Sequence, residues 1–89
     1  MDNMTGMDIA QVRQLSSVIR TKAQDVRSLV DRLTGAIDAV DWKGQDRERF
    51  VTEWRNVHAS ALRGMASSMD EASSAAAASA RAQEEASRR

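Results

Sequence analysis

Apolar residues recur every three or four positions along the first half of the chain, and this interval is the repeat of one face of an α-helix. With Lys22 as an interruption, the series consists of Val12, Leu15, Ile19, Val26, Leu29, Leu33, Ala36 and Val40. Three further residues flank the series and widen it, as in a helix that packs on more than one neighbour: Ala23, Val30 and Ile37. The pattern predicts a helix over about residues 8–40. Thr5 and Asp8 resemble a capping box at its start.

A second apolar series follows an interruption at residues 41–44, where the sequence is Asp-Trp-Lys-Gly. Gly44 suits the left-handed backbone that a turn requires. The second series contains Phe50, Trp54, Val57, Ala61, Leu62, Met65, Met69, Ala72 and Ala76. Its phase slips by one residue near Ala61, so we expect the apolar stripe to wind around the helix. We therefore predict a turn at 41–44 and a second helix over about residues 45–80.

The composition favours an all-α fold, because the chain has no proline and its aromatic residues make up only 3%. Residues 1–80 are predicted to form one antiparallel helical hairpin, since two long helices joined by a short turn must lie side by side. Residues 81–89 contain no large apolar side chain. We expect them to form a polar tail that is frayed or disordered.

Both apolar series are wider than the single seam that a two-helix hairpin can bury, so we expect a second hairpin to cover the remainder. The result would be a four-helix bundle dimer. The residues predicted to form the hairpin core and the pairing surface are Val12, Leu15, Ile19, Val26, Leu29, Leu33, Ile37, Val40, Phe50, Trp54, Val57, Leu62, Met65 and Met69. Gly35 comes opposite Phe50 in such a hairpin, and we expect the glycine to make room for the phenylalanine ring.

Charge and chemistry argue against several function classes. Thirteen basic residues balance thirteen acidic ones, whereas a nucleic-acid-binding protein carries a basic surplus. No stretch approaches the roughly 20 apolar residues of a membrane span, and the first ten residues lack the apolar core of a secretory signal peptide. Cysteine is absent and His58 is the one histidine. We expect no metal site, no cofactor and no enzymatic activity, and we interpret His58 as a structural residue at the seam edge.

The motif Trp42-x-Gly44 stands at the centre of the predicted hairpin. Five residues at intervals of four follow it: Asp46, Phe50, Trp54, His58 and Leu62. Over about residues 7–80 this arrangement resembles the WXG family of type VII secretion proteins. The resemblance implies a non-enzymatic helical hairpin that pairs with itself or with a second WXG-type hairpin protein. It also implies a turn motif of Trp42 and Gly44, contact with the type VII secretion machinery, and secretion from the cytoplasm without a signal peptide.

One feature of the family's exported members is missing. Many of them carry a Tyr-x-x-x-Asp/Glu signal after the second helix, and this chain has no tyrosine. Two interpretations stay open. The chain is either an exported substrate, as a homodimer or as half of a heterodimer, or a cytoplasmic adaptor that pairs with the helical head of a larger secreted toxin.

A row of arginines marks one side of the first predicted helix. Arg13, Arg20 and Arg27 recur at intervals of seven residues and so share a face. Such a row is either the solvated side of the helix or a docking surface for an acidic partner, and we favour the solvated side.

Overall fold

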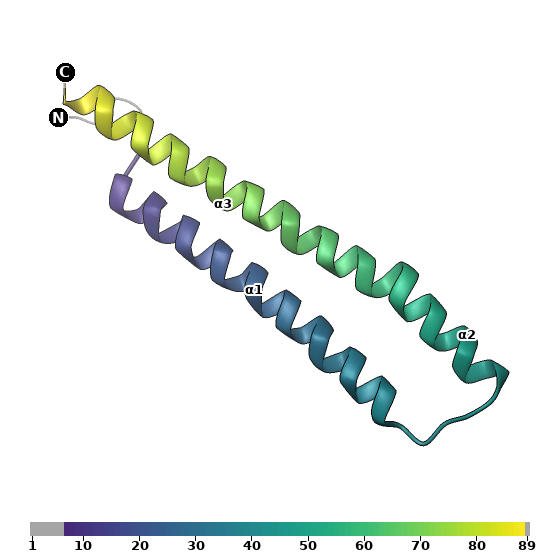
Figure 1. The fold of residues 1–89 in the computed structure, drawn as a ribbon. Helices are drawn as coiled ribbons and strands as arrows, with labels where there is room; N and C mark the ends of the chain where they lie inside the picture. The colour runs from purple at the N-terminus through teal and green to yellow at the C-terminus, as the bar shows by residue number, and fades with distance from the viewer. Residues whose placement is uncertain (1–6, 89) are drawn as a thin grey trace.

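Two antiparallel helical rods lie side by side in the computed structural model, which describes residues 7–88 (Figure 1). The first rod is α1 (Ile9–Ala39). The second rod joins α2 (Gln45–Glu53), a π-helical segment η1 (Trp54–Ala59) and α3 (Ser60–Ser87). No strand occurs in this part of the chain, and the predicted all-α two-helix hairpin is confirmed. The hairpin measures 67 × 17 × 15 Å.

The two ends of α1 lie close to their predicted positions. The helix starts where the Asp8 side chain accepts a hydrogen bond from the backbone N–H of Gln11, at 3.1 Å, which satisfies one of the free donors of the first turn. Thr5, the other residue of the predicted capping box, lies outside the described residues. At the other end, Val40 turns to an extended conformation, with ψ at 135°. The helix therefore covers residues 9–39 where 8–40 was predicted.

Gly44 shapes the connection between the rods. Its φ is 113° and its ψ is −178°, and it is the one described residue with a positive φ. This combination is almost restricted to glycine, because a Cβ would collide with the backbone. The Gly44 carbonyl then accepts the N–H of Glu48 at 3.2 Å, which starts α2. Gly44 therefore has the positive φ that was expected at the chain reversal.

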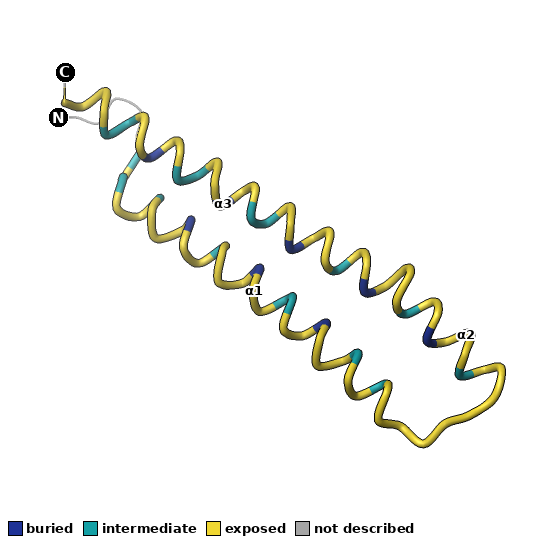
Figure 2. Tube along the Cα trace, in the orientation of Figure 1, coloured by how far each residue is buried: buried dark blue, intermediate teal, exposed yellow. Residues whose placement is uncertain are grey.

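The seam between the rods consists of small side chains, spaced at seven-residue intervals except at one step in the second rod. Its buried members are Ser16, Ala23 and Val30 of α1, with Val51, Ala59, Ala66, Ser73 and Ala80 of the second rod. In Figure 2 these positions line the inner sides of the two rods. Ala23 and Val30 were expected to flank the seam, and instead they form its centre. Small side chains let the two helix axes approach closely, so the larger apolar residues lie beside the contact line.

The phase slip of the second apolar series has a local cause in η1. Buried residues on either side of this segment, Val51 and Ala59, are eight positions apart, whereas the later ones are seven apart. A π-helical turn closes i→i+5 hydrogen bonds and so accommodates one extra residue. The predicted one-residue slip is present, but an inserted residue at 54–59 produces it, rather than a stripe that winds gradually around the helix.

The second rod continues to Ser87. The prediction of a frayed tail at 81–89 is therefore wrong for residues 81–87, which are helical. Ala80 is fully buried against α1, and Gln83 and Glu84 are half-buried. The Arg13 guanidinium also forms an ion pair with the Glu84 carboxylate across the rods. Contacts with α1 therefore extend the helix beyond the end that large apolar side chains alone had suggested.

Two sets of hydrogen bonds fix the register of the rods. Ser16 Oγ donates to the Ser73 carbonyl at 2.8 Å, and Ser73 Oγ donates to the Ser16 carbonyl at 2.7 Å. Nearer the turn, the Trp54 indole N–H donates to Thr34 Oγ1 at 2.9 Å, and this hydroxyl donates to the Val30 carbonyl at 2.8 Å. Every buried polar side-chain atom among the described residues has a partner. These reciprocal bonds were not predicted from the sequence.

Gly35 does not make room for Phe50. A Cβ built at Gly35 would meet nothing within 4 Å, because this residue lies on the side of α1 away from the second rod. The Phe50 ring packs instead on Trp42, with ring centroids 5.5 Å apart and the planes inclined by 50°.

Candidate functional site

None of the fourteen residues predicted for the core and pairing surface is buried within the hairpin. Half of them are partly covered by the other rod: Val12, Ile19, Val26, Ile37, Trp54, Leu62 and Met69. The other half are exposed: Leu15, Leu29, Leu33, Val40, Phe50, Val57 and Met65. The exposed fractions are large for such apolar side chains, reaching 52% at Leu15 and 56% at Met65.

The exposed side chains follow a simple rule of position. Leu15, Leu29, Phe50 and Met65 each directly precede a buried seam residue. One residue corresponds to a rotation of about 100° around the helix, so each of these side chains lies to the same side of the seam direction on its own rod. Because the rods are antiparallel, these sides coincide on one face of the hairpin. We call this surface the apolar face and define it by Leu15, Leu29, Leu33, Val40, Phe50 and Met65. Val57 lies instead among polar residues on the outer side of the second rod.

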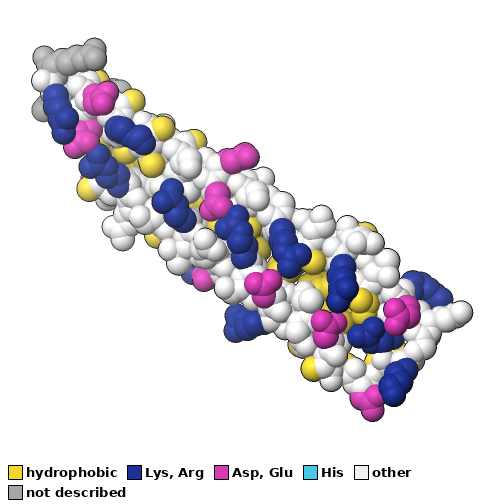
Figure 3. Space-filling view, in the orientation of Figure 1, with side chains coloured by type: hydrophobic (Ala, Val, Ile, Leu, Met, Phe, Trp, Pro, Cys, Tyr) yellow, Lys and Arg dark blue, Asp and Glu magenta, His cyan; other side chains and the backbone are white. Residues whose placement is uncertain are grey.

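Ion pairs occupy the opposite side of the seam. Arg27 bonds Asp70 at 2.6 Å, and Arg63 bonds Asp31 at 3.3 Å. Nearer the turn, the Asp38 carboxylate forms ion pairs with Arg55 at 3.7 Å and with Arg47 at 3.9 Å. Figure 3 shows this side, where Lys and Arg side chains follow the line between the rods with Asp and Glu beside them. We call it the charged face.

The Arg13–Glu84 pair extends the charged face toward the chain termini. A hydrogen bond from the Arg13 guanidinium, together with its charge, lowers the pKa of the Glu84 carboxyl below its ordinary value. The nearby Arg88 adds a smaller effect in the same direction. The carboxylate form of Glu84 is therefore the one that the hairpin favours.

Two aromatic side chains, one in the turn and one in α2, are exposed to solvent at this end of the hairpin. Trp42 is 37% exposed and Phe50 is 47% exposed, and their rings are in contact. Phe50 belongs to the apolar face, so the Trp42 indole extends that face around the tip of the hairpin. The ring on which the Trp42 indole packs is that of Phe50.

His58 lies on the surface of the second rod, with its side chain 55% exposed. Its Nε2 atom is 3.5 Å from a Glu53 carboxylate oxygen, and its ring is 6.3 Å from that of Trp54. Among the described residues no group of three or more His, Cys, Asp or Glu side chains is arranged to hold a metal ion. No helix in this part of the chain is long and apolar enough to cross a membrane.

Comparisons of this chain with protein-family models, with curated proteins and with solved structures give no match. A helical hairpin as a fold is compatible with many functions. The features of this hairpin that bear on function are its two faces and the residues of its turn.

Proposed function

We propose that the protein works by pairing its apolar face with a second helical hairpin to form a four-helix bundle. The observation that carries the proposal is the exposure of the six large apolar side chains of that face. They share one side of a rod whose opposite side is occupied by ion pairs. Monomeric proteins rarely leave a continuous apolar surface of this kind uncovered.

The total surface supports the same proposal. The hairpin exposes 6466 Å², whereas a compact monomer of its mass, 9.8 kDa, would expose about 5,200 Å². The radius of gyration is 19.8 Å, compared with about 12 Å for a globular chain of this length. The difference in area, about 1,300 Å², is larger than the roughly 800 Å² that one partner buries in a protein–protein interface of standard size.

We further propose that the protein is a non-enzymatic component of a type VII secretion system of the WXG type. Support comes from the position of Trp42-x-Gly44 at the reversal of the hairpin and from the positive φ of Gly44. In this proposal the chain is an exported substrate, as a homodimer or as one half of a heterodimer. The alternative is a cytoplasmic adaptor that pairs with the helical head of a larger secreted toxin.

Light scattering combined with circular dichroism tests the pairing. We expect either a helical species of twice the chain mass or a weakly helical monomer that becomes helical when a partner hairpin is added. Leu29→Glu should prevent pairing, because it places a charge on the apolar face. Gln24→Glu is the matched control, since it adds the same charge at an exposed position of the same helix. The proposal would be contradicted if the chain is a fully helical monomer that melts cooperatively and if Leu29→Glu does not lower its stability.

Export is tested separately, by following the tagged chain in bacteria that possess or lack a type VII export ATPase. A secreted substrate appears in the medium only when the ATPase is present, and Trp42→Ala reduces its amount. An adaptor stays in the cells while the toxin that it accompanies leaves them. Release that is independent of the ATPase, for chain and partner alike, would exclude a role in this pathway.

A further inference from the structure

The charged face has a repeating register with one position left out. On both helices this register consists of the residues that come four positions after a seam residue. Those of α1 lie opposite those of α3. In this register Arg13 pairs with Glu84 and Arg27 pairs with Asp70. Arg20 lies midway between these two arginines, and the corresponding position on α3 is Ala77, which has no carboxylate.

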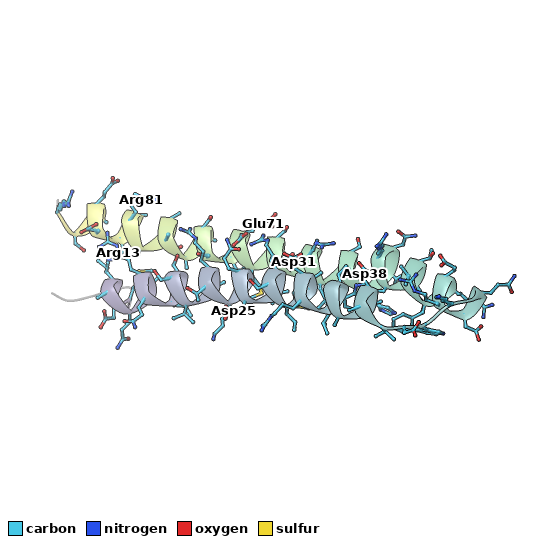
Figure 4. The ribbon with its side chains drawn as sticks, turned by 60° about the horizontal axis from the view of Figure 1, so that its bottom comes forward. Arg13, Asp25, Asp31, Asp38, Glu71 and Arg81 are labelled. Atoms are coloured by element: carbon cyan, nitrogen blue, oxygen red, sulfur yellow. The ribbon has the colours of Figure 1, made fainter. Side chains whose placement is uncertain are left out.

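The side chains of Arg20 and Arg81 have no ion pair or hydrogen bond with any residue in the range 7–88. Both line one shallow hollow on the surface, of about 500 Å³, together with Ser17, Ala77 and the Arg13–Glu84 pair. In Figure 4 Arg13 projects from α1 and Arg81 from α3 at the same end of the hairpin. The hollow therefore contains two guanidinium groups without a partner and an exposed serine.

We propose that this hollow is a docking site for a carboxylate side chain on an acidic segment of a partner protein. The neighbouring positions on the charged face already bind carboxylates, at Asp70 and Glu84. Two successive positions are about 10 Å apart along a helix. A carboxylate supplied from outside would complete the row at Arg20, and Arg81 would contact the same group from α3.

A carboxylate fits this hollow better than the phosphates of a nucleic acid. Two unpaired guanidinium groups are available, and the carboxylates of Asp70 and Glu84 lie on either side of them. A polyphosphate chain passing along the row would meet these negative charges, and the protein as a whole has no basic surplus to offset them. A single carboxylate entering between them avoids that repulsion.

The site lies on the charged face, so it stays accessible whether or not the apolar face is paired. The proposal consequently does not depend on the pairing proposed above, and a failure of one leaves the other intact. It assigns a role to the middle member of the arginine row, while Arg13 and Arg27 hold the hairpin together.

Titration of the ¹⁵N-labelled protein with a hexaglutamate peptide at low salt tests the site. We expect the amide shifts to concentrate at residues 16–20 and 77–81. Ala77→Glu should weaken binding of the peptide, because the new carboxylate would form an ion pair with Arg20, just as Asp70 does with Arg27. Ala77→Gln, of similar size but uncharged, should bind like the original chain. A loss of affinity of about two- to fivefold is expected for Ala77→Glu and for Arg20→Gln, the range of an exposed ion pair.

Arg32→Gln is the control for general charge effects, because Arg32 is exposed on the same helix and has no ion pair within the described residues. Equal weakening by Arg32→Gln and Arg20→Gln would overturn the proposal, as would equal weakening by Ala77→Glu and Ala77→Gln. Inorganic phosphate serves as a competitor at matched ionic strength. If phosphate shifts the same amides with the affinity of the peptide, the hollow binds anions without preference, and the proposal of an acidic protein segment is wrong.

Discussion

Two glycines of similar appearance in the sequence have opposite roles in the structure. Gly44 has φ at 113° and connects the rods, whereas Gly35 lies near the C-terminal end of α1, where a Cβ would meet nothing within 4 Å. The first satisfies a backbone requirement, and the second is an exposed helical residue with weak helix propensity. The sequence alone suggested a packing role for Gly35, which the structure removes.

Gly44→Ala is expected to destabilise the hairpin by about 1–3 kcal/mol, because alanine is strained at this φ and ψ. Thermal unfolding followed by circular dichroism measures the effect. Gly35→Ala provides the matched control, since it should instead stabilise the protein by about 1 kcal/mol through helix propensity. Equal changes in melting temperature for the two variants would show that the backbone of Gly44 is not restrictive.

Ser73 is the residue at which the closeness of the rods can be tested. Its side chain is fully buried and bonded to Ser16. Ser73→Ala should cost about 1 kcal/mol, the net value of a hydrogen bond, while Ser73→Leu should cost about 3 kcal/mol or more, because it forces the helices apart. Urea denaturation of the two variants separates these values. A leucine variant as stable as the alanine variant would mean that the seam tolerates larger side chains.

At the scale of elements, η1 is the irregular part of the second rod. It contains the one extra residue that sets Val51 and Ala59 eight positions apart. From Ala59 onward the regular spacing of seven returns, and it persists to Ala80. The π-helical turn therefore lets the residues on both of its sides face α1.

Deletion of Asn56 from η1 is expected to leave a continuous α-helix with the same residues in the seam. The melting temperature should change by only a few degrees, about the effect of 1 kcal/mol in a domain of this size. Deletion of Ser68 from α3 is the control, because it would rotate Ser73 and Ala80 by about 100° out of the seam. If the deletion of Asn56 lowers the melting temperature as much as the deletion of Ser68, the extra residue of η1 contributes to the stability of the hairpin.

At the scale of the whole molecule, the hairpin is long and thin, and its buried core is small. Val30 and Ser73 are the largest side chains that it buries completely. Such a core contributes little hydrophobic free energy compared with the apolar face left outside it. The stability of the folded chain should therefore depend strongly on pairing.

The melting temperature is expected to rise with protein concentration if the chain pairs with itself, because association is linked to folding by mass action. Circular dichroism melts over a hundredfold range of concentration measure this dependence. The Gln24→Glu variant should show the same dependence, and Leu29→Glu should show none. A melting temperature independent of concentration in the original chain would indicate that the partner hairpin is a different protein.

The sequence by itself determined the two helices, the position of the turn and the phase slip, because helix periodicity and the conformational preference of glycine act over a few neighbouring residues. It did not determine which stripe of α1 faces the second rod. The stripe of Leu15 and Leu29 and the stripe of Ser16, Ala23 and Val30 lie next to each other on the same helix. Hydrophobicity favours the first stripe as an intramolecular seam.

The tertiary structure selected the second stripe, because small residues allow the rods to approach within reach of the Ser16 and Ser73 hydrogen bonds. That selection turned the leucines outward and created the apolar face. The burial of Ala80 and the ion pair of Glu84 with Arg13 also extended the second rod to Ser87. The last residues of this rod contain no large apolar side chain that could have predicted it. Contacts between residues far apart in the chain decided both outcomes, and no local pattern contains them.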